Sequence, residues 1–150
     1  MGASAILDLG FYPLSLEYFL FNKYKKKINF SKLEKSKKLG FDVSGNVLIS
    51  DKNFYRFYIW GYNFSYKNSI KIIFEKGIIK MNFIFSKNIN RTKLKILIKN
   101  KVKYYEYKDI NQEEIAFKKY LKLRKEESKK NELIALSKLI DKVNLYGKNT

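Results

Sequence analysis

The sequence predicts an α+β fold, in which an open, mostly antiparallel sheet of about six or seven strands carries an N-terminal helix and two C-terminal helices on one face. Three observations predict this class. Apolar residues recur at helical spacing near both ends, they alternate with a period of two between residues 41 and 107, and no segment resembles a flexible linker. We therefore expect a single domain over residues 1–150, with helix 4–21, sheet 27–107 and helices 111–145.

The first expected helix, 4–21, has an apolar stripe made of Phe11, Leu14, Tyr18 and Phe21, with Ser15 and Glu17 off the stripe. Pro13 conflicts with an unbroken helix, because an interior proline removes the hydrogen bond to the carbonyl of Leu9. We expect the helix either to kink near Gly10 or to start afresh with Pro13 in its first turn.

The sheet is expected to begin with an edge strand near Ile28–Leu33, because flanking lysines discourage an edge from pairing with other chains. The segments VSGNVLIS and NFYRFYIWGYNF predict a strand pair, and two hairpins follow, turning at Glu75-Lys76-Gly77 and at Asn100-Lys101. In the strand at 92–98, lysine alternates with leucine and isoleucine, which is typical of a half-solvated strand. The stretch 54–60 has aromatic residues on both faces, so we expect it to be central, with a second copy of the chain covering one face.

Residues 111–145 return to helical spacing. One apolar set runs from Ile115 to Leu123, a charged run follows, and a second apolar set runs from Leu133 to Val143. We expect two helices with a turn near Lys129–Asn131.

Composition restricts the chemistry that this chain can perform. It contains neither cysteine nor histidine, which excludes disulfides, thiolate metal sites and imidazole bases. The apolar stretch 5–21 is interrupted by Asp8, Pro13 and Glu17 and is too short for a membrane span. It also lacks the features of a signal peptide, so we expect a cytoplasmic protein that does not contact a membrane.

The formal net charge of +18 suggests binding to nucleic acid. However, nearly all of the positive charge is lysine, and the other abundant residues, Asn, Ile, Phe and Tyr, share its A/T-rich codons. Arginine, the preferred reader of phosphates and guanine edges, occurs only at Arg56, Arg91 and Arg124. We therefore expect the base composition of the gene, rather than nucleic-acid binding, to explain the charge.

Asp8 and Tyr12 are the candidate catalytic residues. They are four residues apart and share a helix face, so a carboxylate and a phenol can converge on one ligand. Tyrosine acts as a general acid or base when a nearby cation lowers its pKa of about 10. The alternative is that Asp8 caps a turn and Tyr12 fills the core. The glycines form neither G-x-G-x-x-G nor a Walker loop, and we expect no cofactor-binding or metal-binding residues.

The surrounding segments resemble the second domain of the Gfo/Idh/MocA oxidoreductase family. GASAILDLGFY is similar to the small-residue start and the apolar-apolar-Asp-x-Gly-x-(His or Tyr) motif of that domain, and WGYNFSYKNSIKIIFEKGIIKMNFIFS is similar to its central strands. The matching positions in the second segment are Trp60, Lys67, Asn68, Ile70, Glu75, Lys76, Gly77, Phe85 and Ser86. Order and spacing agree over most of residues 2–86. Ala3, Ser4 and Phe74 depart from the pattern, because glycine is usual at those places.

The resemblance implies an open sheet with helices on one face and an oligomer interface on the other. It implies that Tyr12 exchanges a proton with a sugar hydroxyl or ketone, as in members acting on sugars, nucleotide sugars or dihydrodiols, and that Asp8 orients the site. Lys67 and Asn68 are taken as structural. Full members also carry a Rossmann domain for NAD or NADP and a catalytic lysine, and these 150 residues contain neither.

We therefore expect the substrate-binding and oligomerisation half of an NAD(P)-dependent sugar or nucleotide-sugar oxidoreductase, truncated or split. Alone it should be inactive and unable to bind NAD or NADP, so its status as an enzyme is left open. The expected partners are further copies of the chain, bound through the open sheet face, and a separate Rossmann-domain chain. The alternative function is a basic single-stranded nucleic-acid-binding module, which exposed aromatic residues on a sheet face would favour.

Overall fold

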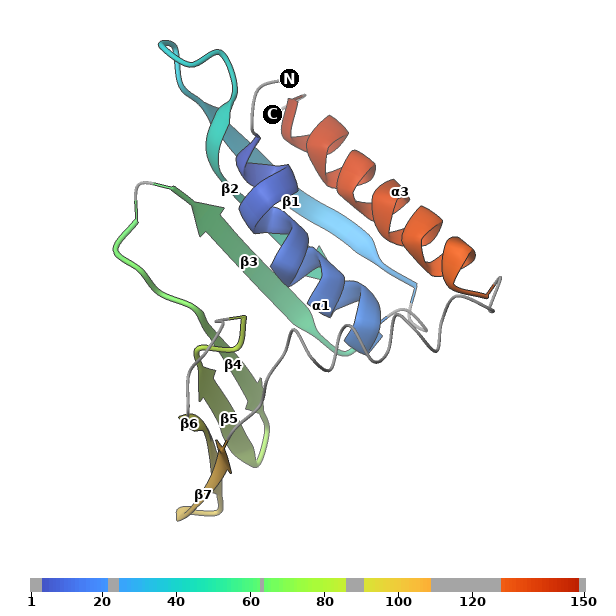
Figure 1. Cartoon of the computed structure of the whole chain (residues 1–150). Helices are drawn as coiled ribbons and strands as arrows, with labels where there is room; N and C mark the ends of the chain where they lie inside the picture. The colour runs from blue at the N-terminus through green and yellow to red at the C-terminus, as the bar shows by residue number, and fades with distance from the viewer. Residues whose placement is uncertain (1–3, 22–24, 63, 86–90, 109–127, 149–150) are drawn as a thin grey trace. The chain divides into compact units, whose positions relative to one another are not determined.

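The computed structural model describes residues 4–21, 25–62, 64–85, 91–108 and 128–148. The chain divides into two compact units (Figure 1). The first contains Met1–Phe64 together with Glu127–Thr150, and the second contains Ser65–Glu126.

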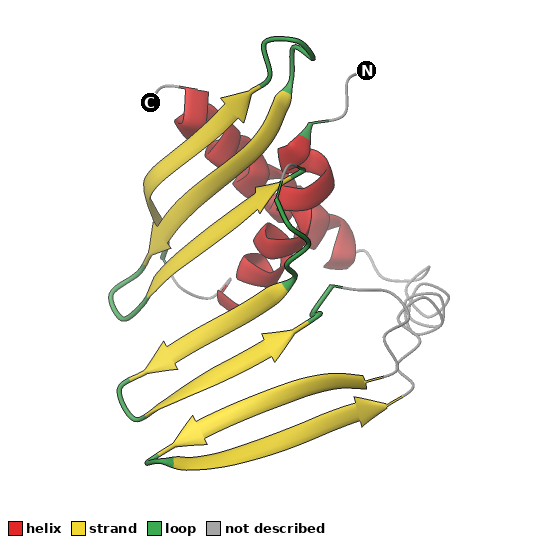
Figure 2. Cartoon of the chain, turned by 90° about the vertical axis from the view of Figure 1, so that its left-hand side faces the viewer, coloured by secondary structure: helices red, strands yellow, loops and turns green. Residues whose placement is uncertain are grey.

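The first unit is an antiparallel sheet with helices on one face (Figures 1 and 2). Its strands are β1 (Lys27–Lys35), β2 (Asp42–Ser50) and β3 (Tyr55–Gly61), in the order β1-β2-β3. A π-helical turn, η1 (Ile6–Gly10), leads directly into α1 (Phe11–Phe21), and the chain returns as α3 (Ser128–Lys148). Pro13 therefore lies in the first turn of α1, as in the second expected arrangement, but the helix does not start afresh there, because η1 runs into α1 without a break.

The core of this unit lies between the helices and one face of the sheet. Leu136, Ile140 and Val143 recur at helical spacing along α3 and are at most 7% exposed. The remaining buried hydrophobic residues come from η1, α1, β2 and β3, and they are Ala5, Ile6, Leu14, Val47, Ile49 and Trp60. Apolar burial on this face thus joins segments from both ends of the sequence.

The opposite face of the same sheet carries an apolar row next to polar residues such as Lys32 and Asn46. The strand register aligns Phe30, Leu48 and Phe57 in one row across β1, β2 and β3. On β3, Tyr55, Phe57 and Ile59 are 81%, 59% and 57% exposed. The expectation of two apolar faces on this strand is confirmed, but the expected central position is wrong. Among the described strands β3 pairs only with β2.

The second unit is a four-stranded antiparallel meander. Its strands are β4 (Ser69–Phe74), β5 (Gly77–Asn82), β6 (Arg91–Ile98) and β7 (Lys101–Lys108), in sequential order. Both predicted hairpins are present. In the second, Lys99 and Asn100 have φ values of 46° and 63°, which is the left-handed backbone that a two-residue hairpin turn requires.

The predicted α+β class is confirmed, with the N-terminal helix, seven antiparallel strands and a C-terminal helix in place. Hydrogen bonds group the strands as three and four. The first expected C-terminal helix falls in residues 109–127, outside the described residues. The turn expected near Lys129–Asn131 is wrong, because α3 already begins at Ser128 and no glycine or proline interrupts it there. No described helix combines the length and the apolar character needed to span a bilayer.

Candidate functional site

A carboxylate from the sheet fixes where the first helix begins. Asp42, at the start of β2, accepts hydrogen bonds from the hydroxyl of Ser4 (2.5 Å) and from the backbone N–H of Ile6 (2.8 Å), and it is 8% exposed. A negative charge at this end is favourable because the first N–H groups of a helix have no partner within it. Asp42 therefore holds η1 in a defined place on the sheet.

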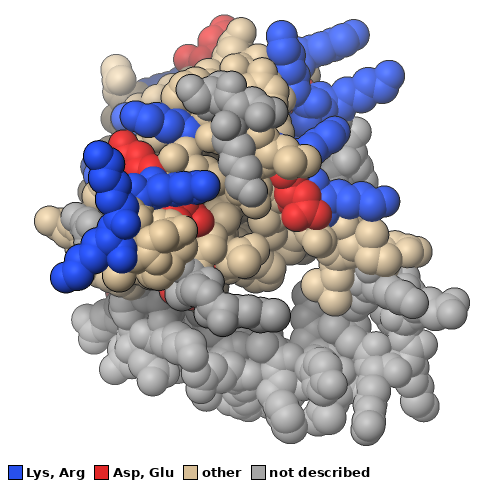
Figure 3. Space-filling model, turned by 90° about the horizontal axis from the view of Figure 1, so that it is seen from above, with Lys and Arg blue, Asp and Glu red and all other residues tan. Residues whose placement is uncertain are grey.

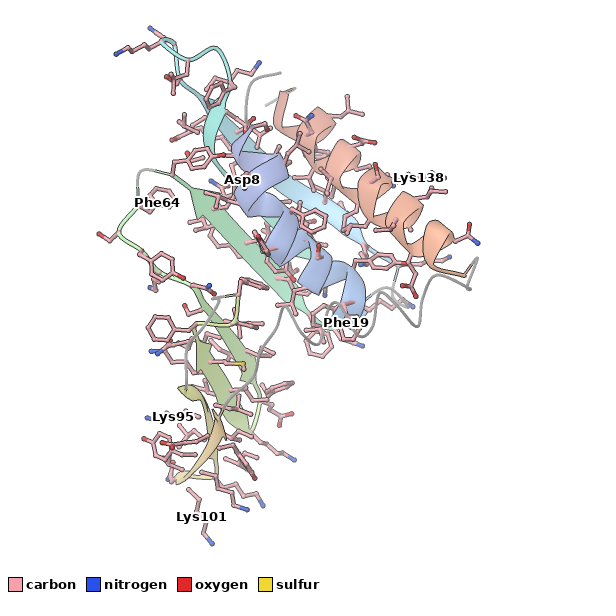
Figure 4. All side chains as sticks on the ribbon, in the orientation of Figure 1. Asp8, Phe19, Phe64, Lys95, Lys101 and Lys138 are labelled. Atoms are coloured by element: carbon pink, nitrogen blue, oxygen red, sulfur yellow. The ribbon has the colours of Figure 1, made fainter. Side chains whose placement is uncertain are left out.

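Asp8 lies in the π-helical turn and is exposed (Figure 4). π-helical turns are rare and occur frequently at functional sites. The carboxylate of Asp8 accepts a hydrogen bond from the hydroxyl of Tyr62, at 3.0 Å. Tyr62 is itself positioned by the sheet, because its backbone N–H donates to the carbonyl of Val43 at 3.0 Å.

Tyr12 lies in the first turn of α1, one helical turn beyond Asp8, and is 45% exposed. Its ring meets that of Phe11 edge to face, with 6.1 Å between the ring centroids. A tyrosine that filled the core would be buried, so this exposure argues against the alternative in which Tyr12 serves packing. The same helical segment thus presents a carboxylate and a phenol to solvent.

Close packing against Trp60 keeps this segment on the sheet. Trp60, in β3, is 4% exposed. A Cβ added to Gly10 would lie 2.9 Å from the Trp60 ring, and one added to Gly45 would lie 2.6 Å from it. Both distances are shorter than a normal carbon–carbon contact, so only glycine allows the helix and β2 to approach the indole this closely.

Tyr62 is the site residue that sequence reasoning missed. It follows β3 and is 54 residues from Asp8, and no spacing in the sequence links the two. Partial burial raises the pKa of the Tyr62 phenol, and its donation to Asp8 and the charges of Asp8 and Asp42 raise it further. At neutral pH Tyr62 is therefore a hydrogen-bond donor that orients the carboxylate, rather than a base.

A buried ionic cluster fixes the other end of α1. Glu17, which is fully buried, accepts hydrogen bonds from Nε of Arg56 and from the hydroxyl of Tyr58, both at 2.7 Å. Nζ of Lys26 lies 3.1 Å from the second carboxylate oxygen. Burial, followed by the hydrogen bond to Glu17, raises the pKa of Tyr58 well above its ordinary value. Because Arg56 and Tyr58 belong to β3, the cluster joins α1 to the strand that leads to Tyr62.

Arg56 also contacts Asp51 and the ring of Phe21. Its Nη1 donates to the carboxylate of Asp51 at 2.5 Å, and its guanidinium lies 4.6 Å from the ring centroid of Phe21. Desolvation lowers the pKa of Arg56, but the hydrogen bonds and charges of Glu17 and Asp51 outweigh it, so the net shift is upward. The guanidinium is therefore a permanent positive charge inside this unit.

The chemistry open to this site is hydroxyl recognition and proton exchange. A carboxylate accepts hydrogen bonds from hydroxyl groups, and a phenol both donates and accepts them. Within the described residues, no lysine or arginine forms an ion pair with Asp8, and no cluster of acidic residues could hold a metal ion. The sequence contains neither a G-x-G-x-x-G pattern nor a Walker loop, the glycine-rich loops that receive the phosphates of NAD(P) in other proteins.

A pocket of about 710 Å³ lies away from Asp8 and Tyr12, between the C-terminal part of α1, β1 and α3. Its lining consists of Tyr18, Lys26, Ile28, Ala135, Lys138, Leu139, Asp141, Lys142, Leu145 and Tyr146. None of the candidate site residues lines it.

Asn68 supports the second unit. Its side-chain oxygen accepts a hydrogen bond from the N–H of Phe85 at 3.0 Å, and its backbone carbonyl accepts one from the N–H of Phe83. These bonds tie the start of β4 to the segment after β5, which agrees with the structural part assigned to this position. Lys67 is exposed.

No protein-family model and no curated protein matches the chain. Solved structures of KijD10, a 3-ketoreductase from Actinomadura kijaniata, do match it. A variant bound to TDP-benzene and NADP gives a TM-score of 0.88 at 16% identity, over 97% of this chain and 48% of that one. The open conformation gives a TM-score of 0.84 at 18% identity, over the same 97% of this chain and 48% of that one. The structure with NADP alone gives a TM-score of 0.85 at 17% identity, over 95% of this chain and 47% of that one. The chain therefore has the fold of about half of KijD10 and spans about half its length.

Proposed function

We propose that this chain is the substrate-binding and oligomerisation half of an NAD(P)-dependent oxidoreductase that acts on sugars or nucleotide sugars. The observation that carries the proposal is the match to KijD10, which extends over 97% of this chain. It is supported by the exposed carboxylate and phenol on the first helical segment. In this proposal another domain or chain holds the cofactor, which agrees with the absence of a G-x-G-x-x-G pattern from these 150 residues. A cytoplasmic location belongs to the same proposal.

Each site residue has a distinct role in this proposal. Tyr12, which is 45% exposed, exchanges a proton with the substrate hydroxyl or carbonyl oxygen through its phenol hydroxyl group. Asp8 accepts a hydrogen bond from a neighbouring substrate hydroxyl and so orients the ring of the sugar. Tyr62 is a positioning residue, because its hydroxyl holds the Asp8 carboxylate at 3.0 Å.

The test of catalysis combines this chain with a Rossmann-domain protein and measures NAD(P)H-dependent reduction of keto-sugars. We expect no turnover by the chain alone. In a complemented mixture, Tyr12→Phe should lower kcat by about 100-fold or more, because general acid–base catalysis contributes at least that much. Tyr55→Phe is the matched control, since Tyr55 is an exposed tyrosine on the other face of the sheet. Turnover by the isolated chain, or equal loss in both variants, would contradict the proposal.

The open face of the three-stranded sheet is the proposed interface between copies. The row of Phe30, Leu48 and Phe57 contains no charge, and such a patch is typical of a contact surface. We expect sedimentation equilibrium to show an oligomer that Phe57→Lys converts to monomer. Leu133→Lys, at an exposed position on α3, should leave the oligomer intact. A monomeric unmodified chain would refute this part alone.

A further inference from the structure

Three lysines lie directly opposite one another across the second sheet. The register pairs Lys71 of β4 with Lys80 of β5, and Lys80 with Lys95 of β6, and Tyr104 of β7 completes the line. Directly opposed residues share a face of the sheet, and all four of these side chains are exposed. We call the three lysines with Tyr104 the lysine row.

Abundance of lysine does not explain this alignment. Lysine and arginine side chains project elsewhere as well (Figure 3), so their number alone marks no site. Like charges placed directly opposite on a sheet destabilise it. Within the described part of the chain, no ion pair joins Lys71, Lys80 or Lys95 to an acidic side chain.

The surroundings of the row are also strongly basic. Residues 65–85 and 91–108 contain ten lysines and one arginine, but only two glutamates. One of these, Glu106, is on the same face as the row, two residues beyond Tyr104 and diagonal to Lys95. The row is therefore a positive strip that a chain of negative groups would complement.

Tyr104 adds an aromatic surface at the end of the row. The residue is 62% exposed, and Nζ of Lys95 lies 5.7 Å from the centroid of its ring, a favourable cation–π distance. The next row on this face is aliphatic and consists of Ile73, Ile78, Leu97 and Val102. An anionic partner would thus meet a line of charges beside apolar side chains.

We propose that the lysine row binds single-stranded nucleic acid. The outer lysines are two strand spacings apart, about 10 Å, a distance that successive phosphates of one strand can follow. Tyr104 requires an unpaired base for stacking, and in a duplex the base faces are covered by neighbouring pairs. This surface lies wholly in the second unit, and it shares no residue with the proposed oxidoreductase site.

The test is fluorescence anisotropy of a labelled oligothymidylate of about 15 nucleotides, titrated with the full chain over a series of salt concentrations. For single strands, the logarithm of the binding constant falls with the logarithm of the salt concentration, with a slope of about −0.7 per phosphate contact. Each contact therefore raises the binding constant about fivefold at about 0.1 M salt. The triple variant Lys71→Gln/Lys80→Gln/Lys95→Gln should therefore bind about 100-fold more weakly and reduce the slope by about 2.

The control carries the same change in net charge. Lys37→Gln/Lys38→Gln/Lys52→Gln removes three exposed lysines from turns of the first unit, and we expect a much smaller loss. Tyr104→Leu should weaken binding by about fivefold or more, while Tyr104→Phe should preserve it. The row variant should melt at the same or a higher temperature, because it loses like-charge repulsion.

Three results would overturn the proposal. These are an equal loss of affinity in the two triple variants, equal affinity for a duplex of the same length, and binding to phosphatidylserine vesicles without binding to the oligonucleotide. Each leaves the oxidoreductase proposal unaffected.

Discussion

Removing the charge of Glu17 should destabilise the protein strongly, because that carboxylate is fully buried among three cationic or hydroxyl donors. Glu17→Gln preserves the volume of the side chain and one acceptor oxygen, but it leaves Arg56 with a single carboxylate partner, Asp51. Breaking a buried ion pair from one side costs about 3–5 kcal/mol. Since Asp51 still compensates part of the arginine charge, we expect a loss near the lower value, about 3 kcal/mol.

The single tryptophan provides the assay. Trp60 is 4% exposed and packs in the same unit, so its fluorescence should report unfolding in urea. A loss of about 3 kcal/mol corresponds to a fall of about 10 °C in Tm for a chain of this length. Glu34→Gln is the matched control, because Glu34 pairs with Lys32 at 3.5 Å and both side chains are more than half exposed. It should cost about 1 kcal/mol or less.

A double-mutant cycle separates the ion pair from general disruption. We expect Glu17→Gln and Arg56→Met to be coupled by about 2 kcal/mol, since the two side chains share one short hydrogen bond. A coupling below about 0.5 kcal/mol would refute the reasoning, as would equal losses in Glu17→Gln and Glu34→Gln.

Three further outcomes are expected. The N–H of Asn53, together with Arg56, lowers the pKa of Asp51, so the contribution of Asp51 to stability is present above its ordinary pKa of 3.8 and is lost as the pH falls below that value. In Asp51→Asn, the urea concentration at the unfolding midpoint should therefore fall less steeply as the pH is lowered. Gly45→Ala should destabilise by about 1–3 kcal/mol, because its Cβ would lie 2.6 Å from the Trp60 ring, and an unchanged urea midpoint would contradict this. Tyr62→Phe should lower the free energy of unfolding by about 0.5 kcal/mol or less, because its hydrogen bond to Asp8 is exposed. In the assay with the Rossmann-domain protein, the same variant should raise KM. Unchanged kinetics would show that Tyr62 does not belong to the site.

Local sequence patterns predicted most of the elements. Alternation identified the strands, because this signal acts between near neighbours. Both hairpins were predicted, but the second turn lies at Lys99 and Asn100, one residue earlier than expected, and Gly77 already belongs to β5. The burial of Glu17 was not predicted. It lies off the apolar stripe of its helix, and only the partners on β3 and the segment at Lys26 make its burial favourable. The edge position of β3 was missed for a related reason, since alternation describes the faces of a strand and not its neighbours.

The candidate site shows the same division between local and tertiary information. Asp8 and Tyr12 could be named from their spacing and from the resemblance, because both lie on one helical segment. Tyr62 could not, since its approach to Asp8 depends on Gly10 and Gly45 admitting the Trp60 ring and on the Glu17 cluster holding α1 against β3. A loss of packing at Trp60 should therefore disturb the Asp8–Tyr62 hydrogen bond before it unfolds the sheet. The candidate site is thus a product of the tertiary packing. If it binds the proposed substrate, substitutions that loosen that packing should reduce substrate binding even where they touch no substrate.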